Sequence, residues 1–228
     1  MIFPLGSLIN AAAIILGGGV GMILGSRLPD RIRHIVFQGL GLCTMVIGLK
    51  MALTMNNALV VIFSIAGGGI IGEIVGIENG LMRMADALKK RIRTGNPRFT
   101  EGFVSTAVMF CVGSMAILGP FDEGLRGDTT ILMTKSILDG LFSVGFAAAM
   151  GLGVLFSSVP VFIYQGVLTI FAGFLQPYLS PAIMTELTAT GGILIVGIGI
   201  NIMEIKKIPL ANMLPALPLA IVLAHFFA

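Results

Sequence analysis

Charged residues are scarce in this chain. Lys, Arg, Asp and Glu together make up 11% of its 228 residues, and hydrophobic residues make up 56%. A water-soluble domain carries about 25% charged residues, so this composition excludes a soluble globular protein. The mean hydropathy of +1.02 indicates instead that most side chains face lipid.

Histidine and cysteine are also scarce, with 2 of each. Cys43 and Cys111 stand alone within apolar stretches, so we expect them to be packing residues. His34 and His225 fall at opposite membrane faces in the topology given below, which excludes a serine–histidine pair or a histidine metal site. The chain also lacks a GxxxxGK[ST] phosphate-binding motif and a GxGD aspartate motif. We therefore expect no enzyme activity, no metal and no cofactor.

The apolar residues form continuous runs of about 20 residues, the length that an α-helix needs to cross a bilayer. The sequence therefore predicts an all-α fold, a polytopic transmembrane helical bundle of about eight spans within a single membrane domain, residues 1–228. An alternative is that Pro120–Asp139 forms a re-entrant element. The predicted spans are Leu8–Ser26, Ile35–Thr54, Ala58–Ile77, Phe103–Leu118, Thr130–Leu155, Val161–Phe174, Ile183–Met203 and Leu210–Phe227.

Basic residues between the runs predict the orientation, because cytoplasmic loops are rich in Lys and Arg. These residues follow the first, third and seventh spans, so all of them fall on one side, and both termini then face out of the cytoplasm. We expect a bacterial inner membrane protein, and we attribute the net charge of +3 to topology rather than to a nucleic-acid partner. The basic groups are Arg27, Arg31 and Arg33; Arg83, Lys89, Lys90, Arg91, Arg93 and Arg98; and Lys206 and Lys207.

The longest of these loops, at about 79–100, contains an amphipathic pattern. Leu81, Met84 and Leu88 recur at helical spacing in Gly80–Arg93, with basic residues opposite. The pattern predicts a helix that lies on the cytoplasmic lipid headgroups.

Glycines recur at spacings that place them on one helix face. Such GxxxG stripes allow close helix packing within one chain, a homodimer contact, or a backbone surface that lines a substrate path. Two other glycine pairs share one spacing: Gly41 with Gly48, and Gly192 with Gly199. This match suggests an inverted repeat that relates spans 1–3 to spans 6–8. The stripes are Gly17, Gly21 and Gly25 in the first span, and Gly68, Gly72 and Gly76 in the third.

Ionisable and amide side chains within the spans are the candidate sites for a solute or ion, because such groups are costly in lipid and usually face the bundle interior. Asp139 and Lys135 lie four residues apart, on one helix face. The alternatives are an internal neutralised pair for Asp139 and Glu73, and a place at the membrane interface for Glu186. The full candidate set is Asp139, Lys135, Glu73, Asn10, Gln38, Asn201 and Glu186.

The central block of the chain resembles a family of bacterial membrane proteins, the YqgA/YdfK type, known as domain of unknown function 554. The resemblance extends from Gly6–Asn10 to Gly199–Asn201 and implies a transport role with no stated substrate. The residues that carry it are Phe110–Gly119, Gly124–Asp128, Lys135, Ser136, Asp139 and Gly140.

A polytopic bundle with buried polar groups and glycine-rich helices predicts transport of a small solute or ion. A proton- or sodium-coupled secondary carrier fits best, since weakened helices, buried carboxylates and a repeat are typical of carriers. An ion channel and a non-transporting assembly or scaffold protein stay open as alternatives.

Overall fold

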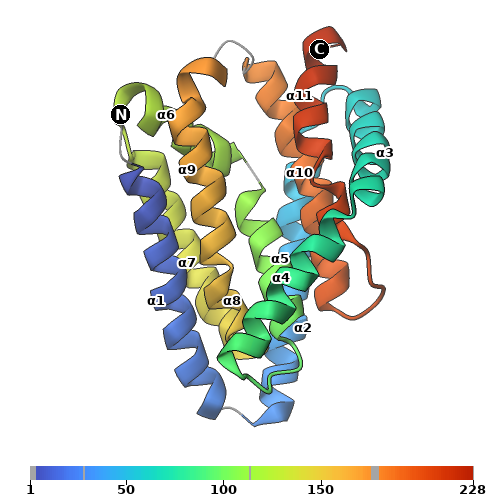
Figure 1. Cartoon of the computed structure of the whole chain (residues 1–228). Helices are drawn as coiled ribbons and strands as arrows, with labels where there is room; N and C mark the ends of the chain where they lie inside the picture. Colours follow the sequence, from blue (N-terminus) through green and yellow to red (C-terminus); the bar gives the residue numbers. More distant parts are fainter. Residues whose placement is uncertain (1–3, 28, 113, 176–179, 228) are drawn as a thin grey trace. The chain divides into compact units, whose positions relative to one another are not determined.

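The structure, a computed structural model, describes residues 4–27, 29–112, 114–175 and 180–227 (Figure 1). The all-α prediction is confirmed: the described residues form helices and contain no strand. The helices are α1 (Leu5–Arg27), α2 (Asp30–Ala52), α3 (Ala58–Val75), α4 (Ile77–Ile92), α5 (Phe99–Cys111), α6 (Ser114–Arg126), α7 (Thr130–Met150), α8 (Gly153–Phe156), α9 (Ser158–Leu175), α10 (Pro181–Ile202), the 3₁₀ helix η2 (Leu210–Met213) and α11 (Ala216–Phe227).

Several helix ends follow from single residues. The Asn57 side chain accepts a hydrogen bond from the Leu59 amide and caps the start of α3. Gly76, with φ of 72°, ends the same helix. Gly151, with φ of 81°, ends α7 at Met150. The predicted fifth span, which extended to Leu155, is therefore too long by about one helical turn.

By length and composition, six helical segments in the described part of the chain are suited to cross a membrane. A seventh candidate is the pair α5 and α6, bent by 58°. The predicted fourth span, Phe103–Leu118, covers this bend, because its apolar run continues across non-helical Val112. The helical part of α2 from Gln38 to Ala52 is apolar but shorter. The re-entrant alternative for Pro120–Asp139 stays a prediction; in this segment α6 ends at Arg126 and α7 begins at Thr130.

The chain forms two compact units, each made of segments distant in sequence. Unit 1 contains residues 1–39, 82–111 and 115–174, and so holds α1 and α5 to α9. Unit 2 contains residues 40–81, 112–114 and 175–228, and so holds most of α2 together with α3, α10, η2 and α11.

In unit 1, α1 packs on α7 through the first glycine stripe (Figure 1). A Cβ on any of these three glycines would collide with an α7 carbonyl oxygen, so only glycine allows this approach. The numbering rises along both helices, so they run parallel, and α7 of the same chain covers the face that a dimer through this stripe would need. The pairs are Gly17 with Gly140, Gly21 with Val144, and Gly25 with Ala148.

The second stripe, in unit 2, packs against the segment η2 to α11. Gly68 lies against Ala216 and Gly72 lies against Asn212, so α3 and this segment run antiparallel. Gly76 does not extend the contact: a Cβ there would meet only the Asn79 side chain, at 3.9 Å. Gly76 is needed instead for its left-handed backbone at the helix end.

The helices α2 and α10 of unit 2 also meet glycine to glycine. A Cβ built on Gly48 would lie 2.7 Å from the Gly192 carbonyl oxygen, and one on Gly192 would lie 2.7 Å from the Gly48 oxygen. Gly41 and Gly199 approach in the same reciprocal way, at 3.4 and 2.9 Å. The two helices are therefore antiparallel.

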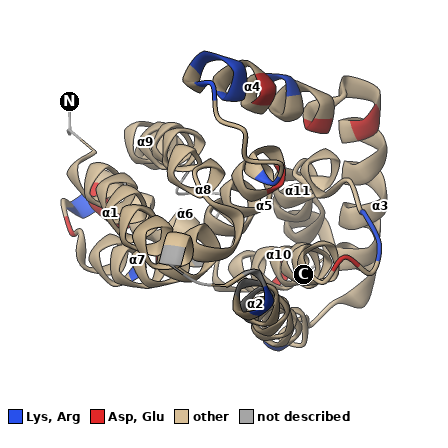
Figure 2. Ribbon diagram, turned by 90° about the horizontal axis from the view of Figure 1, so that it is seen from below, with Lys and Arg blue, Asp and Glu red and all other residues tan. Residues whose placement is uncertain are grey.

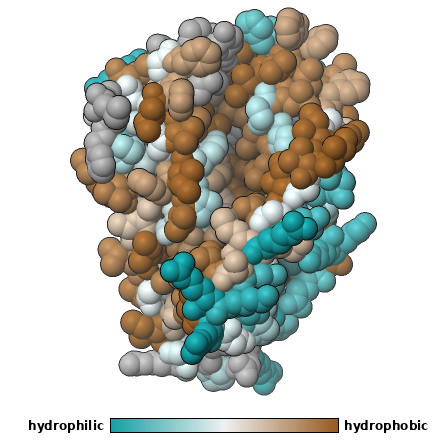
Figure 3. All heavy atoms as spheres, in the orientation of Figure 1, coloured by the Kyte–Doolittle hydropathy of each residue, from teal (hydrophilic) through white to brown (hydrophobic). Residues whose placement is uncertain are grey.

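The surfaces of the helices match a membrane environment. Side chains such as Leu16, Ile74 and Phe174 are more than 70% exposed, which suits contact with lipid tails. By contrast, α4 is amphipathic, with Lys89, Lys90 and Arg91 in its last turn (Figure 2). Hydrophilic side chains gather over this helix (Figure 3). The helix predicted within Gly80–Arg93 is thus present, over Ile77–Ile92.

Candidate functional site

A buried polar cluster lies within unit 1. It consists of Lys135 and Asp139 on α7, Asn10 on α1, and Gln165 on α9. Each of these four residues is at most 5% exposed. The helices α1, α7 and α9 therefore direct these polar side chains toward one another. Polar groups within a membrane are expected to face the bundle interior in this way.

Hydrogen bonds connect the four side chains, and two of these bonds share one carboxylate oxygen of Asp139. Lys135 Nζ lies 2.5 Å from Asp139 Oδ2, and Asn10 Nδ2 donates to the same oxygen at 3.0 Å. Asn10 Nδ2 also donates to Gln165 Oε1 at 3.2 Å. The four-residue spacing of Lys135 and Asp139 thus places them in contact, as the helix geometry predicts.

Several buried polar atoms around this cluster have no hydrogen-bond partner among the described residues. Burying such an atom unpaired costs about 1–3 kcal/mol, so a ligand or a water molecule that paired with these atoms would stabilise the cluster. They are Asn10 Oδ1, Gln165 Nε2, Ser7 Oγ and Ser143 Oγ.

The cluster holds two opposite charges in a buried setting. The Lys135 ammonium group compensates the Asp139 carboxylate and lies 5.8 Å from the centre of the Phe110 ring. Removing one partner from a buried ion pair typically costs about 3–5 kcal/mol, so anything that binds Asp139 must also change the state of Lys135. No group of three or more metal-ligating side chains occurs within the residues that the structure describes.

Glu123 of α6 is a second buried carboxylate in this unit, 2% exposed. It accepts hydrogen bonds from the Gly6 amide, at 2.6 Å, and from Thr169 Oγ1, at 3.2 Å. It therefore caps the start of α1 and ties it to α6 and α9. The predicted spans left Glu123 in the connection between Leu118 and Thr130, and so it was missed as a buried residue.

In unit 2, Glu73 takes part in a different polar group. Asn212 Nδ2 donates to Glu73 Oε2 at 2.6 Å, and Asn212 Oδ1 accepts from the Glu78 amide at 2.6 Å. Glu78 Oε2 accepts from the Ala211 amide at 3.0 Å. Asn212 thus fastens η2 to the corner between α3 and α4, and Glu73 serves that corner rather than the Asp139 cluster.

Burial raises the pKa of Glu78 above its ordinary value of 4.5. The Ala211 amide and the Lys207 charge oppose this rise, and the Glu73 charge adds to it. Glu78 and Asn212 were not among the predicted site residues, because nothing near them in sequence marks them as partners.

The remaining candidates have structural contacts outside the Asp139 cluster. Glu186 Oε1 accepts from the Asn56 and Asn57 amides, both at 2.9 Å, and so supports the start of α3. Asn201 bonds to both backbone groups of Ile208, at 2.7 and 2.8 Å, and closes the loop after α10. Gln38 is exposed and its amide lies 3.2 Å from His34 Nε2.

Comparison with known proteins places this chain in a family. The model of a family described as "Protein of unknown function (DUF554)" matches residues 5–225. The chain belongs to this family. The DUF554 chain is 34% identical to the "Uncharacterized protein YqgA" of Escherichia coli (strain K12), with 96% of each chain covered. It is 31% identical to the "Uncharacterized membrane protein YdfK" of Bacillus subtilis (strain 168), with 97% of each covered. No solved structure matches the DUF554 chain.

Proposed function

We propose that this DUF554 protein is a secondary carrier of a small solute or ion in the bacterial inner membrane, coupled to protons or sodium, and not an enzyme. The observation that carries the proposal is the buried ion pair Lys135–Asp139 held by Asn10, with unpaired polar atoms beside it. Charged groups at membrane depth mark ion pathways and proton relays more often than they mark packing.

The directions of the packed helices support eight crossings. α1 runs parallel to α7, while α2 runs antiparallel to α10 and α3 to α11. Each crossing of the membrane reverses the direction of the chain. If α2 alone failed to cross, or if the pair α5 and α6 alone failed to cross, α1 and α7 would be antiparallel. If both failed to cross, α3 and α11 would be parallel. Counting both as spans satisfies all three directions and brings the two termini to one side.

The reciprocal glycine contacts of α2 and α10 favour an inverted repeat. A shift of 151 residues takes Gly41 to Gly192 and Gly48 to Gly199, since 192 − 41 and 199 − 48 are equal. The contact of Gly41 with Gly199 then maps onto the contact of Gly192 with Gly48. A two-fold axis in the membrane plane produces this exchange, and such axes are common in secondary transporters.

Protonation of Asp139 is the step that we propose for coupling. A proton on this carboxylate removes its negative charge and leaves the Lys135 ammonium group without its counter-ion. The lysine then has to release a proton or gain another anionic or polar partner, because an unpaired buried charge is costly. A sodium ion at the carboxylate would displace the lysine in the same way. Either event links ion binding to a rearrangement of α7 against α1.

Ion flux in proteoliposomes tests the proposal. The purified protein is reconstituted with a trapped pH-sensitive dye, and proton movement is recorded after a proton or sodium gradient is imposed. We expect gradient-dependent flux that Asp139→Asn reduces at least tenfold. Asp122→Asn is the matched control, because Asp122 forms an i,i+4 pair with the exposed Arg126 and does not belong to the Asp139 cluster.

The outcomes separate the functional classes. Exchange of one ion against the gradient of the other supports the carrier. Passive downhill flux alone would indicate a channel, and a folded protein without flux would indicate an assembly or scaffold role. Unchanged flux in Asp139→Asn with unchanged dependence on pH and sodium would make the Lys135–Asp139 pair structural.

A further inference from the structure

The helix α4 carries the excess positive charge of the chain. The segment Ile77–Arg93, which is α4 and the residue after it, contains five basic and two acidic residues, so its net charge of +3 equals that of the whole chain. The rest of the chain is therefore formally neutral. A concentration of positive charge on one helix attracts partners of negative charge. The basic residues are Arg83, Lys89, Lys90, Arg91 and Arg93.

These charges are available to a partner from outside the chain. Arg83, Lys90 and Arg91 are exposed. In the part of the chain that the structure describes, no carboxylate forms a salt bridge with any of these three side chains. Asp86, the acidic residue in the middle of α4, accepts a hydrogen bond from Thr100 Oγ1 at 2.9 Å instead. The positive surface of α4 is therefore not compensated by ion pairs of its own.

The opposite face of α4 carries an apolar stripe that the rest of the chain covers only in part. Ala85 on this stripe is buried, whereas Leu88 and Ile92 are partly exposed. Successive residues are about 100° apart around a helix, so Lys89 and Arg91 lie on the two sides of the stripe. Helices that lie in a membrane interface have this arrangement, with apolar side chains toward the acyl chains and long basic side chains that reach the headgroups.

The start of α4 is fixed at the end of a candidate membrane span. The helix α3 has 18 residues and is therefore about 27 Å long, close to the roughly 30 Å of the hydrocarbon core. Only Gly76 separates α3 from α4, which runs at a slant to it (Figure 1). The Glu78 amide donates to Asn212 Oδ1, and Glu78 Oε2 accepts from the Ala211 amide. No linker therefore allows the start of α4 to extend away from the membrane surface.

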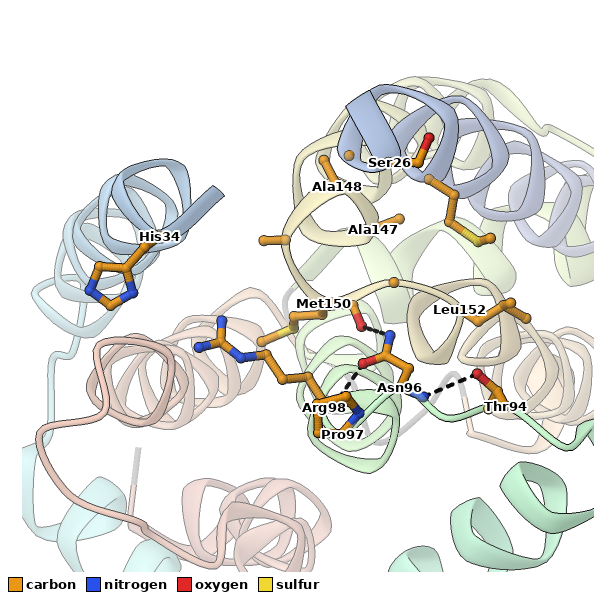
Figure 4. Close-up of a pocket in the computed structure, with 14 residues that line it drawn as sticks. Ser26, His34, Thr94, Asn96, Pro97, Arg98, Ala147, Ala148, Met150 and Leu152 are labelled. Atoms are coloured by element: carbon orange, nitrogen blue, oxygen red, sulfur yellow. Dashed lines mark hydrogen bonds between the residues drawn. The ribbon is translucent and has the colours of Figure 1, made fainter. Parts of the chain in front are cut away.

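The loop after α4 is fixed to another candidate span. Asn96 Nδ2 donates to the carbonyl oxygen of Met150, the last residue of α7, at 2.7 Å (Figure 4). Asn96 Oδ1 accepts from the Arg98 amide at 2.9 Å, just before α5 begins (Figure 4). Both ends of α4 are thus fastened near the ends of membrane helices. The partner that fits this position is the bilayer surface rather than a protein in the cytoplasm.

We propose that α4 binds the phosphate headgroups of anionic lipids in the cytoplasmic leaflet through its basic last turn, Lys89, Lys90 and Arg91. The apolar stripe contacts the acyl chains below, and the basic groups select the anionic headgroups, because basic residues beside a membrane helix attract such lipids. Lys206 and Lys207 also follow the positive-inside rule, but they lie in a loop without an amphipathic helix. The lipid site does not depend on the carrier function.

Lipid-selective quenching of one tryptophan tests the site. The chain contains no tryptophan, so Met84→Trp, at a position on α4 that is 40% exposed, supplies a single reporter. The full chain is placed in equimolar phosphatidylcholine–phosphatidylglycerol nanodiscs in which one lipid or the other carries brominated acyl chains. Lys90→Gln/Arg91→Gln is compared with Lys206→Gln/Lys207→Gln, which removes the same charge from exposed positions in another loop.

We expect brominated phosphatidylglycerol to quench at least about twofold more strongly than brominated phosphatidylcholine in the Met84→Trp protein and in its Lys206→Gln/Lys207→Gln variant. The preference should decrease in Lys90→Gln/Arg91→Gln and at high salt, because salt screens exposed charges. Equal quenching by both lipids, or an equal decrease in both charge variants, overturns the site. Quenching by neither lipid places α4 in water and also overturns it, in favour of a cytoplasmic partner.

A second measurement applies if Met84→Trp does not fold. The melting temperature of the protein without tryptophan is compared in nanodiscs with and without phosphatidylglycerol. We expect phosphatidylglycerol to stabilise the wild type and Lys206→Gln/Lys207→Gln more than Lys90→Gln/Arg91→Gln. The same response in all three proteins overturns the site.

Discussion

Asn10 and Asp139 are 129 residues apart in the sequence, yet the Asn10 amide donates a 3.0 Å hydrogen bond to the Asp139 carboxylate. The same amide group reaches Gln165, so one side chain of α1 holds residues of both α7 and α9. This bond fixes the orientation of the carboxylate that we propose for ion coupling. It also adds a polar link to the glycine packing that joins α1 to α7.

Asn10→Ala should therefore destabilise the protein. Hydrogen bonds between helices in membranes contribute about 0.6 kcal/mol on average and up to about 1.7 kcal/mol. We expect a loss of about 1–2 kcal/mol, since the acceptor is ionised and buried. Unfolding in mixed micelles with increasing SDS measures it. Asn56→Ala, at an exposed position, is the control, and an equal loss in both variants would contradict the role of Asn10.

The α1–α7 contact predicts how the protein responds to the addition of a single methyl group at a glycine. Gly21 faces the Val144 carbonyl, where a Cβ has no space, whereas Gly19 on the same helix has nothing within 4 Å of a Cβ. Gly21→Ala should lower the free energy of unfolding by about 1–3 kcal/mol through overpacking. Gly19→Ala should be neutral or stabilising by up to about 1 kcal/mol. Thermal unfolding of both variants tests this, and a harmless Gly21→Ala would exclude the close contact.

Glu78 predicts a pH dependence of stability. Its pKa is raised in the folded state, so the folded protein binds the proton more tightly than the unfolded chain does. This contribution is present at low pH and is lost as the pH rises from near 4.5 through the raised pKa. Glu78→Gln, which keeps an acceptor for the Ala211 amide, should reduce that loss. Melting temperatures of both proteins between about pH 4 and 8 test this, and parallel curves would contradict it.

Asp128 predicts a pH dependence of stability with the opposite sign to that of Glu78. Its carboxylate accepts a hydrogen bond from the Thr130 amide at 2.9 Å, and contacts with Thr130 lower its pKa below 3.8. Stability from this contact is present above that value and is lost as the pH falls through the lowered pKa. Asp128→Ala should therefore matter less in acid than at neutral pH. Melting temperatures of the variant and the wild type near pH 3 and pH 7 measure the difference.

Topology is testable with reporters. If eight helices cross, a reporter that works only in the cytoplasm should be silent after Ala228 and active when inserted at Gly95. Gly95 is a suitable position, because a Cβ there would meet nothing within 4 Å. Activity at both places would mean that the number of crossings between them is even.

Local features of this fold were predictable, and long-range ones were not. The spans follow from apolar runs of bilayer length, and the contact of Lys135 with Asp139 follows from helix periodicity. The partnership of Asn10 with Gln165 depends on which helices pack together, which no local pattern encodes. The interruption at Val112 was hidden because the apolar residues continue through it. Glu123 looked like a loop residue, since its partner Gly6 is 117 residues away.

The long-range bonds of α1 also impose an order on biosynthesis. This helix is synthesised before its partners, since Glu123, Asp139 and Gln165 follow 117, 129 and 155 residues after the α1 residues that they contact. At about 5–20 residues per second, the 129 residues between Asn10 and Asp139 take roughly 6–26 s to synthesise. During that interval the Asn10 amide and the Gly6 amide lack their final acceptors. The insertion machinery or surrounding lipid headgroups must shelter α1 until the second half of the chain arrives.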